Sequence, residues 1–171
     1  MFRRLSRSRK NHLCLNEMSE QTVHIRSATA DDASIIAEFN IRMAMETENL
    51  ALDPSTISPG VRAVFADPSR GQYFVAESDG NVVGCLMITH EWSDWRNGDI
   101  WWIQSVYVHE DFRRKGLFSA LYQHVQKVAH AAGAVGLRLY MEEENAAAQA
   151  TYQRMGMRLT HYRVLEEMFK G

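Results

Sequence analysis

The sequence predicts an α/β (α+β) fold, with a mixed central sheet of about six strands and helices on both faces. Three observations support it: short runs that alternate apolar and polar residues, longer segments with apolar residues at helical spacing, and one direct succession of strand, helix and strand. Strands joined through a helix lie parallel and strands joined by tight turns lie antiparallel, so the sheet should be mixed.

The first part of the chain is expected to form one strand and two helices. Val23 and Ile25 alternate with polar neighbours, as in a short strand. Thr29 offers an N-cap for a helix that runs to about Glu46, where apolar residues recur at helical spacing. A second helix is expected over residues 54–67, so two helices separate the first strand from the second.

Three consecutive strands are expected next. In chain order they cover residues 72–78, 81–91 and 99–108. The turn Asp79-Gly80 makes the first two a hairpin, and the third should lie beside them. The loop before the third strand carries Trp92 and Trp95, which could form a pocket wall, a subunit contact in a homodimer, or a cover for the core.

The last part is expected to form a helix, a strand, a helix and a strand. In chain order these cover residues 116–132, 136–141, 145–155 and 157–167. Gly156 is the expected stop of the final helix. The strand, helix and strand over 99–141 should place two parallel strands in the sheet.

Composition predicts one domain and gives no general attraction to nucleic acid or membrane. The chain has 171 residues, 46% of them hydrophobic, enough for a continuous core without disulfides or metal. A net charge of −2 attracts neither polyanions nor anionic lipid, and no apolar stretch reaches the roughly 18 to 20 residues that span a bilayer. Cys14 and Cys85 form no metal-binding spacing, and a reducing cytoplasmic location fits best.

The start of the chain is basic and differs from the rest. Residues 1–20 are expected to be a disordered tail, and residues 21–171 a single domain. A stretch rich in Arg and Ser and free of acids until Glu17 is also typical of a mitochondrial transit peptide, and Met18 could be the natural initiator. A nucleic-acid role for this tail would require salt-dependent DNA binding that is lost on its removal.

A strand, a tight basic loop and a helix follow one another directly over residues 106–125. Backbone N–H groups at such a junction point outward at the positive end of the helix dipole, which suits phosphate. Gly116 permits a close approach or an unusual backbone angle, while Arg113, Arg114 and Lys115 add positive charge. The alternative is a solvated connector between two elements.

The loop residues resemble those of a known family. The sequence R-R-K-G-L-F is similar to the pyrophosphate loop of the GNAT superfamily of acetyl-CoA-dependent N-acetyltransferases, usually written Q/R-x-x-G-x-G/A. Arg113 and Gly116 occupy its first and fourth places. Phe118 stands where the family has Gly or Ala, so its side chain must point away from the pyrophosphate or reshape the loop.

A second block resembles the same family independently. The sequence N-A-A-A-Q-A-T-Y-Q-R-M-G-M is similar to the pattern N-x-x-A-x-x-x-Y-x-x-x-G-F, with Asn145, Ala148, Tyr152 and Gly156 in register and Met157 in place of Phe. Both blocks stand in the order and spacing of the family, so the resemblance covers roughly 150 residues. It implies a GNAT-like fold and acetyl-CoA as co-substrate, with no metal.

The resemblance places Tyr152 near the sulfur of acetyl-CoA. A phenol with a pKa of about 10 is protonated at neutral pH and can give its proton to a departing thiolate, whose thiol has a pKa of about 8.5. The alternative is a half-buried aromatic on an amphipathic helix. The expected cofactor-binding residues are Val106, Val108, Arg113, Arg114, Lys115, Gly116, Leu117, Phe118, Ser119, Asn145, Ala148 and Tyr152.

The attacking amine must be neutral, so a base or a water must take its proton. The strand over 100–108 carries no carboxylate, which leaves His90, Glu91 and Asp99 as possible bases, with Gln104 holding a water; each could instead be an ordinary strand or strand-end residue.

The expected substrate-binding residues are Glu46, Glu48 and Gln104. The two carboxylates could select a small cationic amine, or could be a solvated helix end. A protein or peptide amino group is the alternative acceptor, and an acyl-CoA-binding regulatory domain without catalysis is the alternative function.

Overall fold

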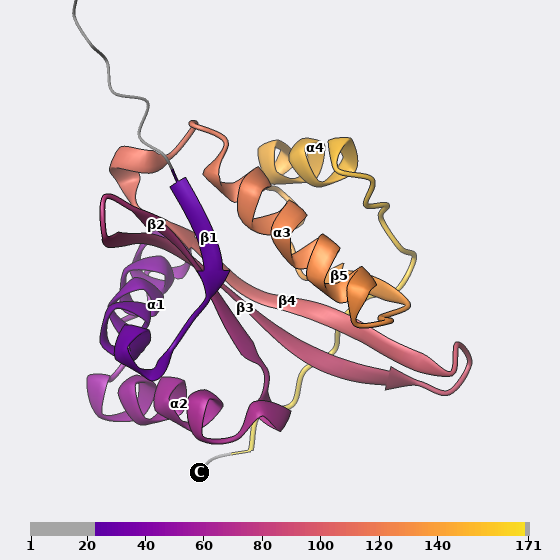
Figure 1. The fold of residues 1–171 in the computed structure, drawn as a ribbon. Helices are drawn as coiled ribbons and strands as arrows, with labels where there is room; N and C mark the ends of the chain where they lie inside the picture. Colours follow the sequence, from indigo (N-terminus) through magenta and orange to yellow (C-terminus); the bar gives the residue numbers. More distant parts are fainter. Residues whose placement is uncertain (1–22, 170–171) are drawn as a thin grey trace, which may run out of the picture.

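The computed structural model describes residues 23–169 and contains one five-stranded sheet with strand order β1-β2-β3-β4-β5 (Figure 1). The strands are β1 (Val23–Ser27), β2 (Gln72–Ser78), β3 (Asn81–Ser93), β4 (Gly98–Val108) and β5 (Gly136–Leu139). The first four are antiparallel to their neighbours, whereas β5 is parallel to β4. The mixed sheet predicted from the connections is therefore confirmed.

Helices cover both faces of the sheet (Figure 1). They are α1 (Ala33–Glu48), α2 (Pro54–Ala66), α3 (Leu117–Ala131) and α4 (Ala146–Arg154). Short 3-10 turns stand at Ala30–Asp32, Pro68–Arg70 and Glu110–Phe112. The expected α/β fold with helices on both faces is confirmed, with element bounds within a few residues of those predicted.

The predicted sixth strand, over residues 157–167, is absent from the structure. This segment forms no strand and runs from α4 past the sheet toward the α2 end of the molecule (Figure 1). Its apolar residues Leu159, Tyr162, Val164 and Leu165 do not alternate strictly, so no single face of a strand could be buried. The neighbouring edge strand β5 is also only four residues long and offers few backbone partners.

Each face of the sheet has its own hydrophobic core. On one face Phe39 of α1 and Val61 of α2 pack on Val75 and Tyr107. On the other, Leu121 of α3 packs among residues of β2, β3 and β4. Because side chains alternate along a strand, Val106 and Val108 of β4 pack on the α3 side while Tyr107 between them packs on the α1 side.

A bulge in β4 marks the point where the sheet opens. Met87 of β3 pairs with Ser105 and Ile88 pairs with Ile103, so Gln104 is the extra residue. The pairing of β4 with β5 ends at the same place, with Ile103 opposite Leu139. From Gln104 onward, the β5 side of β4 therefore has backbone groups with no strand partner among the described residues.

A network of salt bridges connects β1 to the start of α1 and to β2. Arg26 of β1 donates to both carboxylate oxygens of Asp32, at 2.7 and 3.0 Å, and its Nε donates to Glu77 of β2 at 2.9 Å. Asp32 also accepts from the backbone N–H of Thr29 at 2.7 Å. These bonds lower the pKa of Asp32, chiefly through the guanidinium of Arg26.

The expectations for residues 1–20, including a tail, a transit peptide and Met18 as initiator, lie outside the described residues. Across residues 23–169 no helix is both long and apolar enough to cross a bilayer. The same residues contain no group of three or more His, Cys, Asp or Glu side chains placed to hold a metal ion. Cys85 is buried in the sheet, which raises its pKa to about 12.

Candidate active site

The loop between β4 and α3 has the backbone geometry of an anion site. Arg114 and Gly116 both adopt left-handed backbone angles, with φ of 61° and 80°, and Gly116 caps the N-terminus of α3. The first bond into the helix comes from Ala120, whose N–H donates to the Gly116 carbonyl at 3.0 Å. The N–H groups of residues 117–119 precede it and have no acceptor within the helix, so they are available to a phosphate.

Gly116 is required for its backbone angle and not for lack of space. A Cβ placed on it would meet no atom within 4 Å, whereas its positive φ disfavours any residue that has a Cβ.

Arg113 turns toward α1 and fastens the loop to it. Its Nε donates to the Val108 carbonyl at 2.9 Å, and its Nη2 donates to Glu46 Oε2 at 2.6 Å. Its guanidinium lies 5.5 Å from the centre of the Tyr107 ring, and the Tyr107 hydroxyl donates to Glu46 Oε1 at 3.3 Å. Glu46 therefore connects the end of α1 to the loop and is not a free carboxylate.

Arg114 and Lys115 supply the exposed positive charge of the loop. Both side chains are exposed, and the Lys115 ammonium lies 5.3 Å from the centre of the Phe112 ring. Glu48, at the last position of α1, is exposed, and Asn49 ends the helix in a left-handed conformation.

Phe118 points away from the loop surface, into the contact between α3 and α4. Its ring meets Tyr152 edge-on with 5.4 Å between centres, and lies 6.5 Å from Tyr122. A large residue at this position therefore does not cover the backbone N–H groups of the helix N-terminus. Its ring forms part of the contact between α3 and α4.

The helix α4 presents Tyr152. Asn145 caps it, because its Oδ1 accepts from the Ala148 N–H at 3.0 Å, and Gly156 follows its end with φ of 95°. Asn145 and Tyr152 lie two turns apart on one face of the helix. Partial burial raises the pKa of the Tyr152 phenol above its ordinary value near 10, so the hydroxyl keeps its proton at neutral pH.

The open edge of β4 joins these two features. Val106 and Val108 pack on the core beside α3. The unpaired backbone of β4 therefore runs from the bulge toward the N-terminus of that helix. At the bulge the hydroxyl of Ser105 is buried and has no hydrogen-bond partner within the described residues. Gln104 donates to the Thr89 hydroxyl at 2.7 Å. An extended ligand could pair with β4 and end at these polar groups.

The three possible bases lie apart from one another. His90 packs edge-on against Trp101, on the face that carries α3. Glu91 lies on the opposite face and accepts hydrogen bonds from Arg138 and Trp102. Asp99, at the start of β4, is exposed and five residues from the bulge, about 16 Å along the strand.

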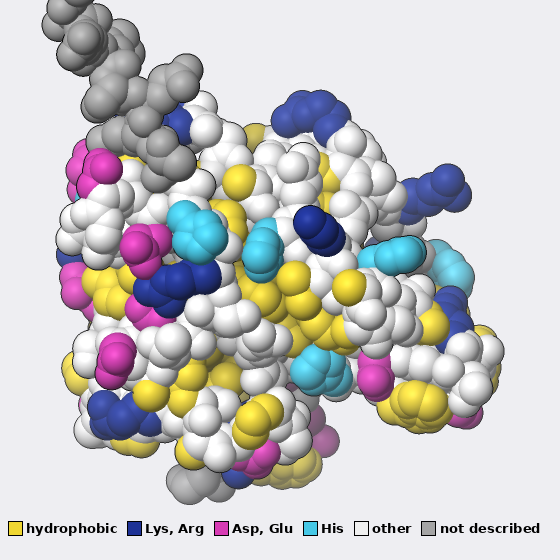
Figure 2. Space-filling model, in the orientation of Figure 1, with side chains coloured by type: hydrophobic (Ala, Val, Ile, Leu, Met, Phe, Trp, Pro, Cys, Tyr) yellow, Lys and Arg dark blue, Asp and Glu magenta, His cyan; other side chains and the backbone are white. Residues whose placement is uncertain are grey.

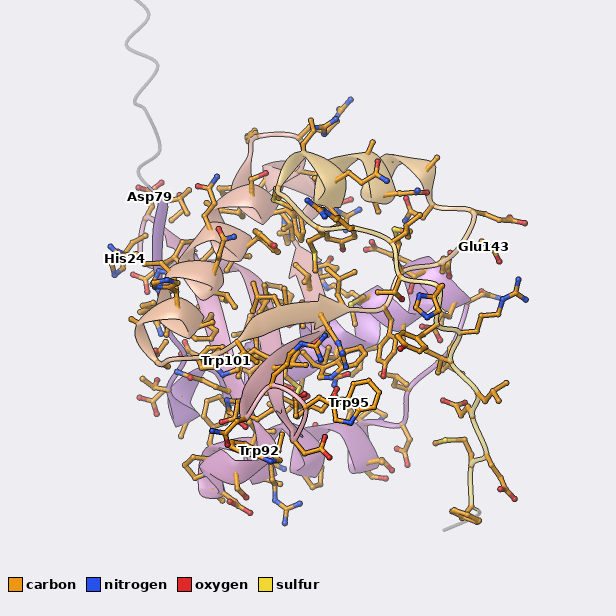
Figure 3. All side chains as sticks on the ribbon, turned by 90° about the vertical axis from the view of Figure 1, so that its right-hand side faces the viewer. His24, Asp79, Trp92, Trp95, Trp101 and Glu143 are labelled. Atoms are coloured by element: carbon orange, nitrogen blue, oxygen red, sulfur yellow. The ribbon has the colours of Figure 1, made fainter. Side chains whose placement is uncertain are left out.

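The hairpin end of β3 and β4 projects from the molecule. Trp92 and Trp95 are 62% and 86% exposed there. Figure 2 shows hydrophobic atoms at that end, and in Figure 3 the hairpin faces the viewer. Trp101 instead belongs to the core on the α3 face, as expected of a packing residue.

The sequence did not predict the buried hydroxyl of Ser105 at the bulge, the contact of Tyr107 with Glu46 or the pairing of Arg138 with Glu91. The one signal available was Arg138, a charged residue in the otherwise apolar run GLRL. The importance of the others depends on the bulge and on contacts between distant segments.

The chain is similar to known proteins in sequence and in fold. Residues 40–157 match the family model described as Acetyltransferase (GNAT) family. The chain is 33% identical over 113 residues to a phosphinothricin N-acetyltransferase of Streptomyces viridochromogenes, a match that covers 65% of this chain and only 61% of that relative.

Solved structures show the same fold. A possible acetyltransferase from Clostridium difficile 630 is 41% identical, with a TM-score of 0.81 over 87% of this chain and 99% of that one. An aminoglycoside N-acetyltransferase in complex with CoA shares the fold at 16% identity, with a TM-score of 0.72 over 86% of this chain and 95% of that one.

Proposed function

Since the chain belongs to the acetyltransferase (GNAT) family, we propose that it transfers an acetyl group from acetyl-CoA to the primary amine of a small molecule. The observation that carries the proposal is the loop of residues 113–119. Its left-handed angles at Arg114 and Gly116 expose the backbone N–H groups at the start of α3, where the pyrophosphate would bind.

The remainder of the cofactor would lie along the open edge of β4. The backbone beyond Gln104 offers hydrogen bonds to an extended chain, because β5 pairs only with residues 100–103. This path leads from the helix N-terminus to the bulge. The thioester would then stand near Ser105, whose buried hydroxyl has no partner within the described chain.

Transfer proceeds by direct attack in this proposal. The amine nitrogen bonds to the thioester carbonyl carbon, the carbon–sulfur bond breaks, and Tyr152 gives its proton to the departing thiolate. The Tyr152 phenol is protonated at neutral pH, so a proton is available to the thiolate, while partial burial raises its pKa and makes it a weaker acid than a free phenol. The proton of the amine leaves through a water that Gln104 holds at the bulge, where its side chain also donates to the Thr89 hydroxyl.

We expect Glu48 to select a cationic acceptor at the end of α1, because the Glu46 carboxylate is held by Arg113 and Tyr107.

Two functions compete with this proposal. The acceptor could be a protein or peptide amino group, or the chain could be an acyl-CoA-binding domain without catalysis.

A panel of amines tests the proposal. The protein is incubated with acetyl-CoA and each amine, free thiol is measured, and the acetylated product is identified by mass spectrometry. Amine-dependent thiol release with a small amine supports the proposal, and release only with peptides favours the protein acceptor. Tight acetyl-CoA binding with no release across small amines and peptides would identify a binding domain.

A further inference from the structure

A polar and aromatic cluster lies on the sheet face that carries α1 and α2. Arg138 of β5 donates through Nη1 to both carboxylate oxygens of Glu91 of β3, at 2.8 and 3.0 Å. The indole N–H of Trp102 of β4 donates to the same carboxylate. The Arg138 guanidinium lies 5.7 Å from the centre of the Trp102 ring, and Tyr140 stacks on that ring with 4.5 Å between centres.

The cluster stands next to the proposed reaction centre. Trp102 precedes Gln104 by two residues, about 7 Å along the strand. Arg138 pairs with Trp102 in the parallel register. The core beneath α1 and α2 reaches β4 at Tyr107, beyond the bulge, so it does not cover this end of the strand. The side chains of Arg138 and Glu91 are accordingly 35% and 40% exposed.

A cavity of about 380 Å³ opens beside the cluster. It is lined by Tyr140 and Met141, which follow β5, and by Val164 and Glu166 of the segment after α4. Tyr140 joins the cavity to the cluster, because its ring contacts Trp102. Glu166 gives the lining a negative charge, and the Arg138 guanidinium lies beside the Trp102 ring that Tyr140 contacts.

The N–H groups of the Arg138 guanidinium that make no hydrogen bond determine what can bind. Within the described residues, Nη1 makes all the hydrogen bonds of this guanidinium, which leaves Nε and Nη2 as free donors. A planar guanidinium held in place by a carboxylate and an indole ring is suited to bind a second oxyanion through two N–H groups. Glu166 in the cavity lining repels a simple anion and favours a ligand that also carries an ammonium.

We propose that Arg138 binds an oxyanion on the acceptor, so the substrate is an amine that also bears a carboxylate or a similar oxyanion. The inference rests on the proposed acetyl transfer and specifies its substrate class. Arg138 is then a specificity residue, and Glu91 and Trp102 position it.

Matched acceptors test this inference directly. An amino acid and its uncharged amide present the same amine and carbon skeleton but differ in the oxyanion. Steady-state kcat/KM is measured for both across several pairs of different length. The wild-type protein is expected to prefer the acid of the best pair by at least about tenfold, as one charge-assisted bidentate contact would give.

Two variants locate the preference at Arg138. Arg138→Gln leaves Glu91 as an unpaired carboxylate that could repel acids, so the double variant Glu91→Gln with Arg138→Gln is measured beside it. Both are expected to lose the preference for the acid while the KM for acetyl-CoA stays within about twofold. Arg70→Gln, which removes an equally charged side chain from a surface ion pair with Asp67, should retain the preference.

The possible results separate the inference from the proposed function. If the wild type acetylates the amides as well as the acids, or if the double variant keeps the acid preference, the inference is overturned and acetyl transfer stands. If no amine of the panel is acetylated, the proposed function fails and the inference fails with it. Melting temperatures and acetyl-CoA affinities identify any variant that does not fold. Arg138→Lys, which keeps the charge without the two-pronged guanidinium, then replaces that variant. It is expected to lose part of the preference for the acid.

Discussion

Replacing Gly116 by Val should separate backbone strain from cofactor binding. A residue with a Cβ pays about 1–2 kcal/mol in the left-handed region that Gly116 occupies at φ of 80°. No atom within 4 Å opposes the new side chain, so strain alone drives the loop to change shape. Such a change moves the N–H groups of residues 117–119, and hydrogen bonds to a charged group contribute about 1.5–3 kcal/mol each. Losing one such bond weakens acetyl-CoA binding by about 10- to 100-fold.

Gly80 provides a matched control for this substitution. It has φ of 76°, a Cβ on it would also meet nothing within 4 Å, and it lies in the turn between β2 and β3. Gly80→Val should therefore lower the melting temperature about as much as Gly116→Val does. Calorimetric titration with acetyl-CoA should show lost affinity for Gly116→Val alone. Equal dissociation constants for the two variants would refute the placement of the pyrophosphate at this loop.

Two further predictions concern ion pairs. Glu46→Gln should raise the KM for acetyl-CoA about 1.4- to fivefold, since the half-exposed pair with Arg113 contributes about 0.2–1 kcal/mol. Glu48→Gln should raise only the KM of a cationic acceptor. The reverse pattern would show that Glu46 does not support the loop. Asp32→Asn should lower the free energy of unfolding by about 1–3 kcal/mol at neutral pH. Because Arg26 holds the pKa of Asp32 below 3.8, this contribution is complete above about pH 4 and is lost as the pH falls through the lowered pKa. Denaturant titrations of wild type and variant should therefore give free energies of unfolding that converge in acid. A difference in these free energies that stays constant with pH would contradict the argument.

The sequence predicted the order of elements well because each depends on local pattern. Apolar spacing and turn residues determine helices and hairpins within a few positions, and the place of the basic loop with Gly116 between a strand and a helix followed from the same local pattern. The segment over 157–167 shows the limit of this reasoning. Its composition suits a strand, but a strand also needs a partner, and β5 offers only four residues.

The contacts of the site depended on residues far apart in the chain. Glu46 and Arg113 are 67 positions apart, and nothing near either residue indicates that they pair. Glu91 was proposed as a base from its place at a strand end, yet its carboxylate accepts from Arg138, 47 positions away. Such pairs follow from strand register and helix packing, which one sequence does not determine.

The measurement that tests the central claim most directly is the turnover of Tyr152→Phe. Loss of the hydroxyl removes an interaction made as the carbon–sulfur bond breaks, so kcat should fall at least about tenfold while acetyl-CoA affinity is unchanged. Tyr122→Phe is the control, because this phenol is buried in the core on the α3 face and its ring also lies beside Phe118. Normal turnover by Tyr152→Phe, or a loss of affinity in proportion to activity, would contradict the account, since Tyr152 would then not be the acid.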